Sequence, residues 1–129
     1  MPHVTFEYSA NIEAECNWPV LLEKINTIMI AQDGVFPTGG IRSRAIRLDH
    51  WRMADGKEDD AFVHATLKTG AGRDEATRKR VGDALFQVMK AHFADLYARR
   101  YLALSLELHE FAKGGTWTHN NVHARFGRP

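Results

Sequence analysis

Two consecutive strand–helix–strand units constrain the fold of this chain more than any other feature of its sequence. In the first unit, a strand near 3–8 precedes a helix that continues to about Ala31, and a long strand near 41–53 closes the unit. Asn17 is the predicted N-cap of this helix. The alternation of the long strand is imperfect at 45–46, which permits a β-bulge there.

The second unit repeats this order along the following residues. It has a strand near 61–69, a helix from about Asp74 to Arg99 with an apolar stripe, and a strand near 102–111. Strands joined by a helical crossover run parallel to each other. The sequence therefore predicts an α+β fold of two tandem βαβ units, whose four strands form one sheet with two helices on one face.

Composition limits the class of protein further. A length of 129 residues fits a single domain over 1–129. The net charge of +1 gives no electrostatic argument for nucleic acid, and no apolar run is long enough to cross a membrane. Cys16 is the single cysteine, which suits a reducing compartment, and no secretion signal is evident. We therefore expect a cytoplasmic protein without nucleic-acid or membrane partners.

One face of the predicted sheet has no helix to cover it. Phe62 and Trp51 are apolar residues that would have to be buried near this face. Their presence favours association of several copies through their sheets. The tail from Thr118 to Phe126 alternates in polarity and is predicted to form a last strand that pairs with a neighbouring chain. A loosely docked terminus is the alternative for this segment.

Pro2 is the residue with the clearest potential for chemistry. If Met1 is removed, the nitrogen of Pro2 becomes a secondary amine that can carry a proton and release it. If Met1 stays, this nitrogen is an amide with no N–H. The strand that follows, with Val4, Phe6 and Tyr8 on one face, would bury such an amine. The simpler interpretation is that Met-Pro only begins the protein.

Two arginines next to glycines are candidates for binding an anion. Arg42 follows a pair of glycines, and Arg73 follows Gly70-Ala71-Gly72 at the start of the long helix. A glycine-rich turn into a helix presents backbone N–H groups at the positive end of the helix dipole. The guanidinium fork matches a carboxylate or a phosphate. Arg44 and Arg47 are nearby alternatives, and each of the four could be an ordinary solvated residue.

The seven histidines do not form a recognisable metal motif. His119 and His123 are four residues apart, but the residues between them indicate a loop or strand rather than a helix. No His-Glu-x-x-His run and no cysteine pair are present. His64 and His109 lie within predicted strands and are interpreted as hydrogen-bonded, half-buried residues. The sequence therefore predicts no metal site.

These features together resemble the 5-carboxymethyl-2-hydroxymuconate isomerases of the tautomerase superfamily. The matching segments follow the family's order over nearly the whole chain, at close to its spacing. They are Met1-Pro2-His3, Phe36-Pro37 with Gly40-Ile41-Arg42-Ser43-Arg44, Met53-Ala54-Asp55-Gly56, Ala61-Phe62-Val63-His64, Lys68 with Gly70-Ala71-Gly72-Arg73, His92-Phe93, Leu102-Ala103-Leu104-Ser105 and Asn120-Asn121-Val122-His123-Ala124. One extra residue near 32–34 is a departure from the pattern.

The resemblance implies a homotrimer that needs no metal or organic cofactor. It implies Pro2, freed of Met1, as the acid–base residue, and Arg42 and Arg73 as substrate-binding residues. The implied reaction ketonises 5-carboxymethyl-2-hydroxymuconate, a tricarboxylate of homoprotocatechuate and 4-hydroxyphenylacetate degradation, to its 2-oxo-3-ene isomer. Two alternatives stay open. One is a tautomerase for another unsaturated oxo-acid, and the other is a trimeric small-anion-binding protein without a catalytic base.

Overall fold

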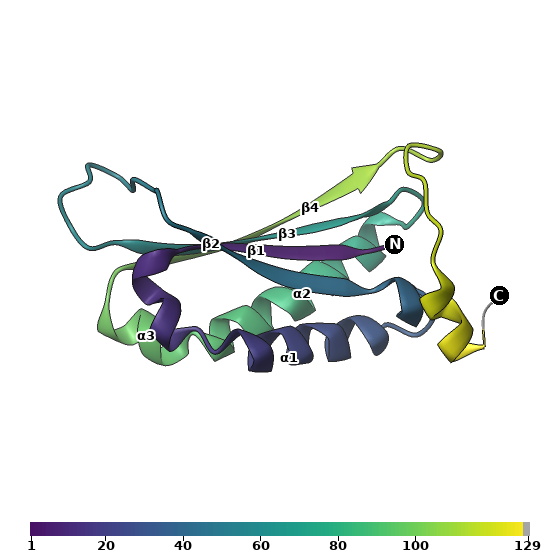
Figure 1. The fold of residues 1–129 in the computed structure, drawn as a ribbon, viewed down its shortest axis with the longest axis horizontal. Coiled ribbons are helices and arrows are strands. Elements are labelled where there is room, and N and C mark those ends of the chain that lie inside the picture. Colours follow the sequence, from purple (N-terminus) through teal and green to yellow (C-terminus); the bar gives the residue numbers. More distant parts are fainter. Residues whose placement is uncertain (128–129) are drawn as a thin grey trace.

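A computed structural model of the chain describes residues 1–127 and shows a sheet with helices packed against one of its faces (Figure 1). The chain runs through the elements in the order β1 (His3–Ser9), η1 (Ala10–Glu15), α1 (Trp18–Ile30), η2 (Thr38–Gly40), β2 (Arg42–Leu48), β3 (Ala61–Gly70), α2 (Glu75–His92), α3 (Ala94–Arg99), β4 (Leu102–Phe111) and η3 (Asn121–Phe126), in which η marks a 3-10 helix.

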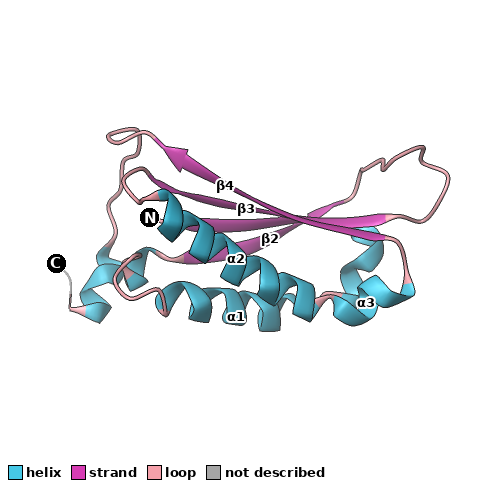
Figure 2. Cartoon of the chain, turned by 180° about the vertical axis from the view of Figure 1, so that it is seen from behind, coloured by secondary structure: helices cyan, strands magenta, loops and turns pink. Residues whose placement is uncertain are grey.

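The sheet joins the two units side by side. Its strand order is β2-β1-β3-β4. β1 and β2 are parallel, β3 and β4 are parallel, and the two units meet where β1 pairs antiparallel with β3. Seen from both sides, α1 and α2 lie on the same face of this sheet (Figure 2). The predicted tandem βαβ fold is therefore confirmed.

The core lies between the sheet and the two long helices. Every second residue of β1 and β3 is buried against these helices, because side chains alternate between the two faces of a strand. The buried sets are Val4, Phe6 and Tyr8 of β1, Ala61, Val63, Ala65 and Leu67 of β3, Leu21, Ile25 and Met29 of α1, and Val81, Leu85 and Met89 of α2. The other face of the sheet is left without a helical cover.

The second long helix is interrupted where the sequence predicts continuity. Phe93 has φ −98° and ψ 12° between α2 and α3, and its ring is buried with its edge toward Trp18 at a centroid distance of 5.9 Å. Hydrogen bonds from Phe93 N to Met89 O and from Tyr97 N to Phe93 O still cross the junction. The interruption is thus a local distortion around a core side chain.

β2 is shorter than the predicted strand and contains no bulge. It pairs with β1 residue for residue from His3 opposite Arg42 to Ser9 opposite Leu48, so the predicted β-bulge is wrong. The imperfect alternation at 45–46 has another cause: β2 is an edge strand, and Ile46 is 45% exposed on the uncovered face.

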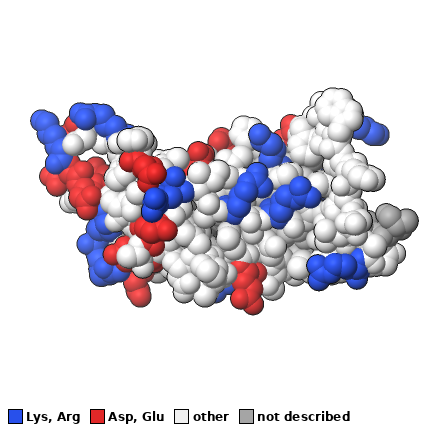
Figure 3. Space-filling model, in the orientation of Figure 1, with Lys and Arg blue, Asp and Glu red and all other residues white. Residues whose placement is uncertain are grey.

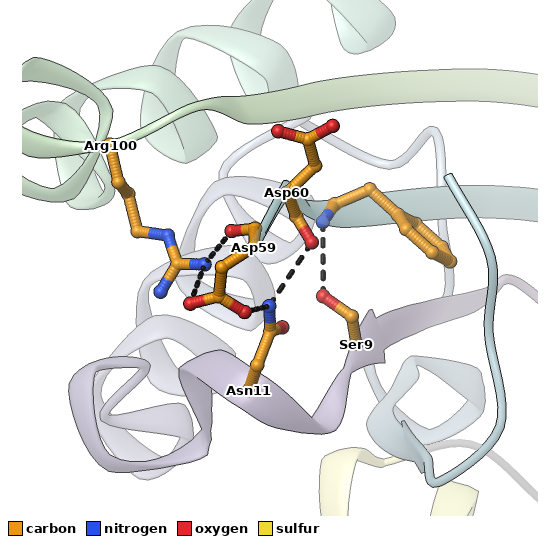
Figure 4. Close-up of polar contacts among 6 residues, drawn as sticks. Ser9, Asn11, Asp59, Asp60 and Arg100 are labelled. Atoms are coloured by element: carbon orange, nitrogen blue, oxygen red, sulfur yellow. Dashed lines mark hydrogen bonds and ion pairs between the residues drawn. The ribbon is translucent and has the colours of Figure 1, made fainter. Parts of the chain in front are cut away.

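The long loop between β2 and β3 is fastened at the end of the sheet far from the N-terminus. The amide of Asn11 donates to Asp59 Oδ1 at 2.9 Å and to the carbonyl oxygen of Asp60 at 3.1 Å. The guanidinium of Arg100 donates to Asp59 Oδ2 at 3.2 Å (Figure 4). These contacts fix the end of the loop just before β3 begins at Ala61.

The tail forms a 3-10 helix where the sequence predicts a strand, so that prediction is wrong. Asn120 is the physical reason. Its Oδ1 accepts from the backbone N–H of Val122 at 2.9 Å and begins η3, while its Nδ2 donates to the carbonyl oxygen of Gly39 at 2.9 Å. As a result η3 lies against η2 at the end of the sheet where the chain begins (Figure 1). No helix within 1–127 is long and apolar enough to cross a membrane.

Candidate functional site

The N-terminus, Arg42 and Arg73 meet at one end of the sheet. Arg42 opens β2 beside His3, and its backbone N–H donates to the carbonyl oxygen of Pro2 at 3.3 Å. Its Nη2 lies 3.9 Å from the sulfur of Met1. Both arginines act electrostatically on the α-amino group of Met1. Three residues from distant parts of the sequence are therefore brought to one place.

The α-amino group at this place has a lowered pKa. In the structure it belongs to Met1, one residue ahead of Pro2, whose own nitrogen is an amide. Burial is the largest cause of the lowering from the usual 8.0, followed by the positive charges of Arg73 and Arg42. Pro2 is buried, whereas Met1 is only half-buried. An amine on Pro2 would therefore experience the same causes in the same direction.

Arg73 is held in a fixed orientation by carbonyl groups. Its Nε and Nη2 donate to the carbonyl oxygen of Val35 at 3.2 and 2.8 Å, and its Nη1 donates to that of Gly70 at 2.9 Å. Its guanidinium lies over the ring of Phe36, 4.7 Å from the centroid. A guanidinium has five N–H groups, so one N–H on each terminal nitrogen has no acceptor within 1–127 and can serve a ligand.

The loop after α1 supplies these anchors. Asp33 and Gly34 adopt left-handed backbone conformations, with φ of 37° and 77°, and turn the chain back toward the sheet. This turn delivers the carbonyl of Val35 to Arg73 and buries the ring of Phe36, which is 5% exposed. The loop after α1 therefore helps to orient Arg73.

The start of α2 differs from the anion site that the glycine-rich turn predicts. Asp74 is the N-cap of the helix, and its Oδ1 accepts from the backbone N–H of Thr77 at 2.8 Å. A carboxylate of the chain already complements the positive end of the helix. Anion binding near this turn thus depends on the side chain of Arg73 rather than on the helix terminus.

Basic residues continue from this end onto the uncovered face of the sheet. Arg44 Nη1 lies 3.1 Å from His3 Nδ1. Because a guanidinium only donates, His3 Nδ1 accepts and its proton is on Nε2. Burial first, then the charges of Arg42 and Arg44, lower the pKa of His3. Lys68 lies opposite His3 on β3, and Figure 3 shows basic side chains grouped over the middle of the molecule.

Arg47, the other arginine alternative, is engaged elsewhere. Its Nε forms an ion pair with Asp49 at 2.9 Å, and both side chains are more than half exposed. It lies toward the far end of β2, opposite Tyr8. The structure therefore places Arg42 and Arg73 at the N-terminus and Arg44 next to His3, and leaves Arg47 as a solvated surface residue.

His123 is the residue at this site that sequence patterns missed. A β-carbon on Gly39 would lie 2.8 Å from the backbone N, the Cα and the Nδ1 of His123, so the tail packs directly on this glycine. A β-carbon on Gly40 would lie 3.5 Å from His123 Cε1 and 3.2 Å from Met1 Cγ. The signal that could have located it is Asn120, a residue type that favours helix N-caps.

The other candidates are Cys16, His64 and His109, and of these His109 lies at the same end of the sheet, opposite Lys68. Cys16 is buried, and burial raises the pKa of its thiol to about 12, so it stays protonated. The carboxylate of Glu107 lies 2.9 Å from His64 Nε2 and 3.1 Å from His109 Nε2. Both histidines are thus hydrogen-bonded. No group of three or more metal-ligating side chains is found among residues 1–127.

The comparison with protein families agrees with this arrangement. The family model described as 5-carboxymethyl-2-hydroxymuconate isomerase matches residues 2–126. The chain belongs to this family. A curated relative from Escherichia coli, 5-carboxymethyl-2-hydroxymuconate Delta-isomerase, is 48% identical over 126 residues, which are 98% of this chain and 99% of the relative.

Solved structures support the same family. A 5-carboxymethyl-2-hydroxymuconate isomerase from Deinococcus radiodurans R1 is 49% identical with a TM-score of 0.92, and the match covers 97% of this chain and 93% of that one. A 5-carboxymethyl-2-hydroxymuconate delta-isomerase is 29% identical with a TM-score of 0.90, covering 100% and 95%. A fused 4-OT described as a symmetric trimer, 13% identical with a TM-score of 0.63 over 91% and 93%, shares the fold alone.

Proposed function

We propose that this isomerase ketonises 5-carboxymethyl-2-hydroxymuconate to its 2-oxo-3-ene isomer in the degradation of aromatic compounds. The observation that carries the proposal is the position of the N-terminus near both Arg42 and Arg73, where the pKa of an α-amine is lowered. Relatives that share about half of their residues with this chain over nearly full length carry the same activity in their names.

Pro2 is the proposed acid–base residue once Met1 has been removed. As a free base, the Pro2 nitrogen takes the proton of the 2-hydroxyl group, and the resulting ammonium returns a proton to C5 of the dienolate. The proton count is unchanged over the cycle, so no cofactor is required. Burial and the two nearby guanidinium groups favour the neutral amine that the first step needs.

The two arginines bind the charged parts of the substrate in this proposal. The free N–H on each terminal nitrogen of Arg73 can donate to a carboxylate, and its carbonyl tethers keep the donors in place before substrate arrives. The guanidinium of Arg42, which is also close enough to act on the terminal amine, stabilises negative charge that develops on the dienolate.

We further propose that the protein is a cytoplasmic homotrimer. The uncovered face of the sheet and the exposed side chains of Trp117 (88% exposed) and Ile46 favour a partner surface. The fold is shared with a fused 4-OT described as a symmetric trimer. Light scattering combined with size-exclusion chromatography tests this assembly, and a monomer at micromolar concentration would contradict it.

The mass of the native protein and its activity before and after amine capping test the acid–base assignment. Protein without Met1 should convert the dienol, and selective carbamylation of the Pro2 amine should abolish turnover. Uncapped Pro2→Ala, which keeps a primary amine, should retain a small part of the activity. Native protein that keeps Met1 and still isomerises the substrate would contradict the role of Pro2.

The two alternatives make different predictions for the same protein. A tautomerase for another oxo-acid would show a higher kcat/KM on a monocarboxylate enol, such as phenylpyruvate enol, than on the tricarboxylate. An anion-binding protein would bind the tricarboxylate without turning it over. Measuring kcat/KM on a panel of enols and binding by calorimetry separates the three functions.

A further inference from the structure

The ring of His123 and the side chain of Met1 both lie next to Gly40. A β-carbon on Gly40 would lie 3.2 Å from Met1 Cγ and 3.5 Å from His123 Cε1. The ring edge made by Nδ1 and Cε1 faces Gly39 and Gly40. Loss of Met1 would therefore free space beside Gly40, next to which Cε1 of His123 lies.

The Nδ1 atom of His123 is buried and has no hydrogen-bond partner within 1–127. Buried polar atoms are nearly always hydrogen-bonded, because an unpaired one costs about 1–3 kcal/mol. The cost is tolerated in functional sites where a ligand supplies the missing partner. The atom lies beside Gly39, and the neighbouring Gly40 borders the Met1 side chain that must leave before the proposed chemistry can occur.

The position of His123 is fixed by specific contacts of the tail. Asn120 fastens the tail to η2 through its 2.9 Å hydrogen bond to Gly39 and starts η3 through its bond to Val122. The absence of a side chain on Gly39 lets the backbone of His123 approach. A 3-10 helix of only six residues thus carries one imidazole to the edge of the site.

We propose that His123 is a substrate-binding residue, whose imidazole hydrogen-bonds an oxygen of the substrate once Met1 has been removed. This inference rests on the proposed function, because it uses the site that Pro2, Arg42 and Arg73 define. The ligand class is an organic carboxylate: Arg42 and Arg73 supply two cationic groups, and the imidazole of His123 supplies a further hydrogen-bonding group with a fixed place.

The test compares His123→Leu with His123→Asn and with a matched control in the same tail, His119→Leu. Leucine removes the polar atom, whereas asparagine keeps a polar atom near the position of Nδ1. His119 is exposed and precedes η3. All proteins are verified by intact mass to lack Met1, and their thermal midpoints are recorded so that a loss of folding is recognised.

His123→Leu should raise KM about tenfold with kcat changed less than threefold, because a hydrogen bond kept in the ground and transition states contributes to binding. His123→Asn should stay within about threefold of the wild type, and His119→Leu should be unchanged. Unchanged KM in His123→Leu, or equal losses in His123→Leu and His123→Asn, would overturn the inference.

A binding measurement separates this inference from the proposed function. Calorimetry with a saturated tricarboxylate, propane-1,2,3-tricarboxylate, requires no turnover. A wild type that binds this probe but does not isomerise the dienol would refute the proposed reaction, and His123→Leu would still decide the role of His123 through a weakened or an unchanged Kd. In Pro2→Leu protein verified by mass to retain Met1, the Met1 side chain still fills the space beside Gly40, so the His123→Leu change should alter Kd less than it does in protein without Met1.

Discussion

Arg73 is tethered to the carbonyl oxygen of Val35 by two of its N–H groups, across 38 residues of sequence. The tether leaves the guanidinium with donors on both terminal nitrogens and holds it through neutral carbonyl groups, which keep its positive charge available. We expect Arg73→Lys to lower kcat/KM for the tricarboxylate by roughly 10- to 100-fold, since a lysine cannot keep the Val35 contacts and present a fork.

The substrate dependence of this loss distinguishes binding from general damage. The kcat/KM of Arg73→Lys for a dienol that lacks one carboxylate should fall less than its kcat/KM for the tricarboxylate. The same difference is expected for Arg73→Ala. Arg80→Lys, on an exposed position of α2, is the matched control and should have wild-type kinetics. Equal losses of kcat/KM for both substrates would mean that Arg73 does not bind that carboxylate.

Arg42 should influence the protonation of the terminal amine as well as binding. Its positive charge lowers the pKa of the amine, so removing the charge should raise that pKa. In the proposed mechanism the free base is the active form, so the acid limb of kcat/KM against pH should move to higher pH in Arg42→Gln and stay near the wild type in Arg42→Lys. The rate of labelling of the amine over the same pH range provides an independent measurement.

The fold could be predicted from sequence because its signals are local. Val4, Phe6 and Tyr8 alternate within seven residues and all face the core. The break at Phe93 could not be predicted, since it arises from packing against Trp18, 75 positions earlier in the chain. The anchoring of Arg73 likewise depends on contacts between residues that are far apart in the sequence, so it could not be predicted either.

The tail shows how a short pattern misleads. Val122, Ala124 and Phe126 alternate as a strand would, but Asn120 offers the backbone a side-chain partner that begins a helix instead. Its second bond, to Gly39, spans 81 residues. A contact of this range is set by the tertiary fold, so the approach of His123 to the site became visible only with the structure.

Gly39→Ala should destabilise the protein by about 1–3 kcal/mol, because its new β-carbon would lie 2.8 Å from backbone atoms of His123, which cannot move as freely as a side chain. Gly82→Ala is the matched control. A β-carbon on Gly82 would meet nothing within 4 Å, and the position is within α2, so we expect a gain of about 0.5–1 kcal/mol. Urea denaturation of both variants measures the difference. A neutral Gly39→Ala would mean that the tail does not dock as described.

Glu107 should contribute to stability only above acidic pH. Its carboxylate accepts from His64 and His109, and these hydrogen bonds hold its pKa below the usual 4.5. A carboxyl group whose pKa is lower in the folded state stabilises the protein above its unfolded pKa, and this contribution disappears as pH falls through the folded pKa. The free energy of unfolding should therefore decrease below about pH 4.5 partly through this residue.

Glu107→Gln removes the titration while keeping a side chain of similar size. Its unfolding free energy should be lower than that of the wild type near pH 7, and the gap should narrow as the pH falls toward 3, because the wild type then loses the same hydrogen bonds. Glu23→Gln, an exposed α1 residue, serves as the control and should follow the wild-type curve throughout. A constant gap between Glu107→Gln and the wild type from pH 7 to pH 3 would show that the two histidines do not stabilise the ionised carboxylate. In that case the contacts across β3 and β4 would contribute through packing alone.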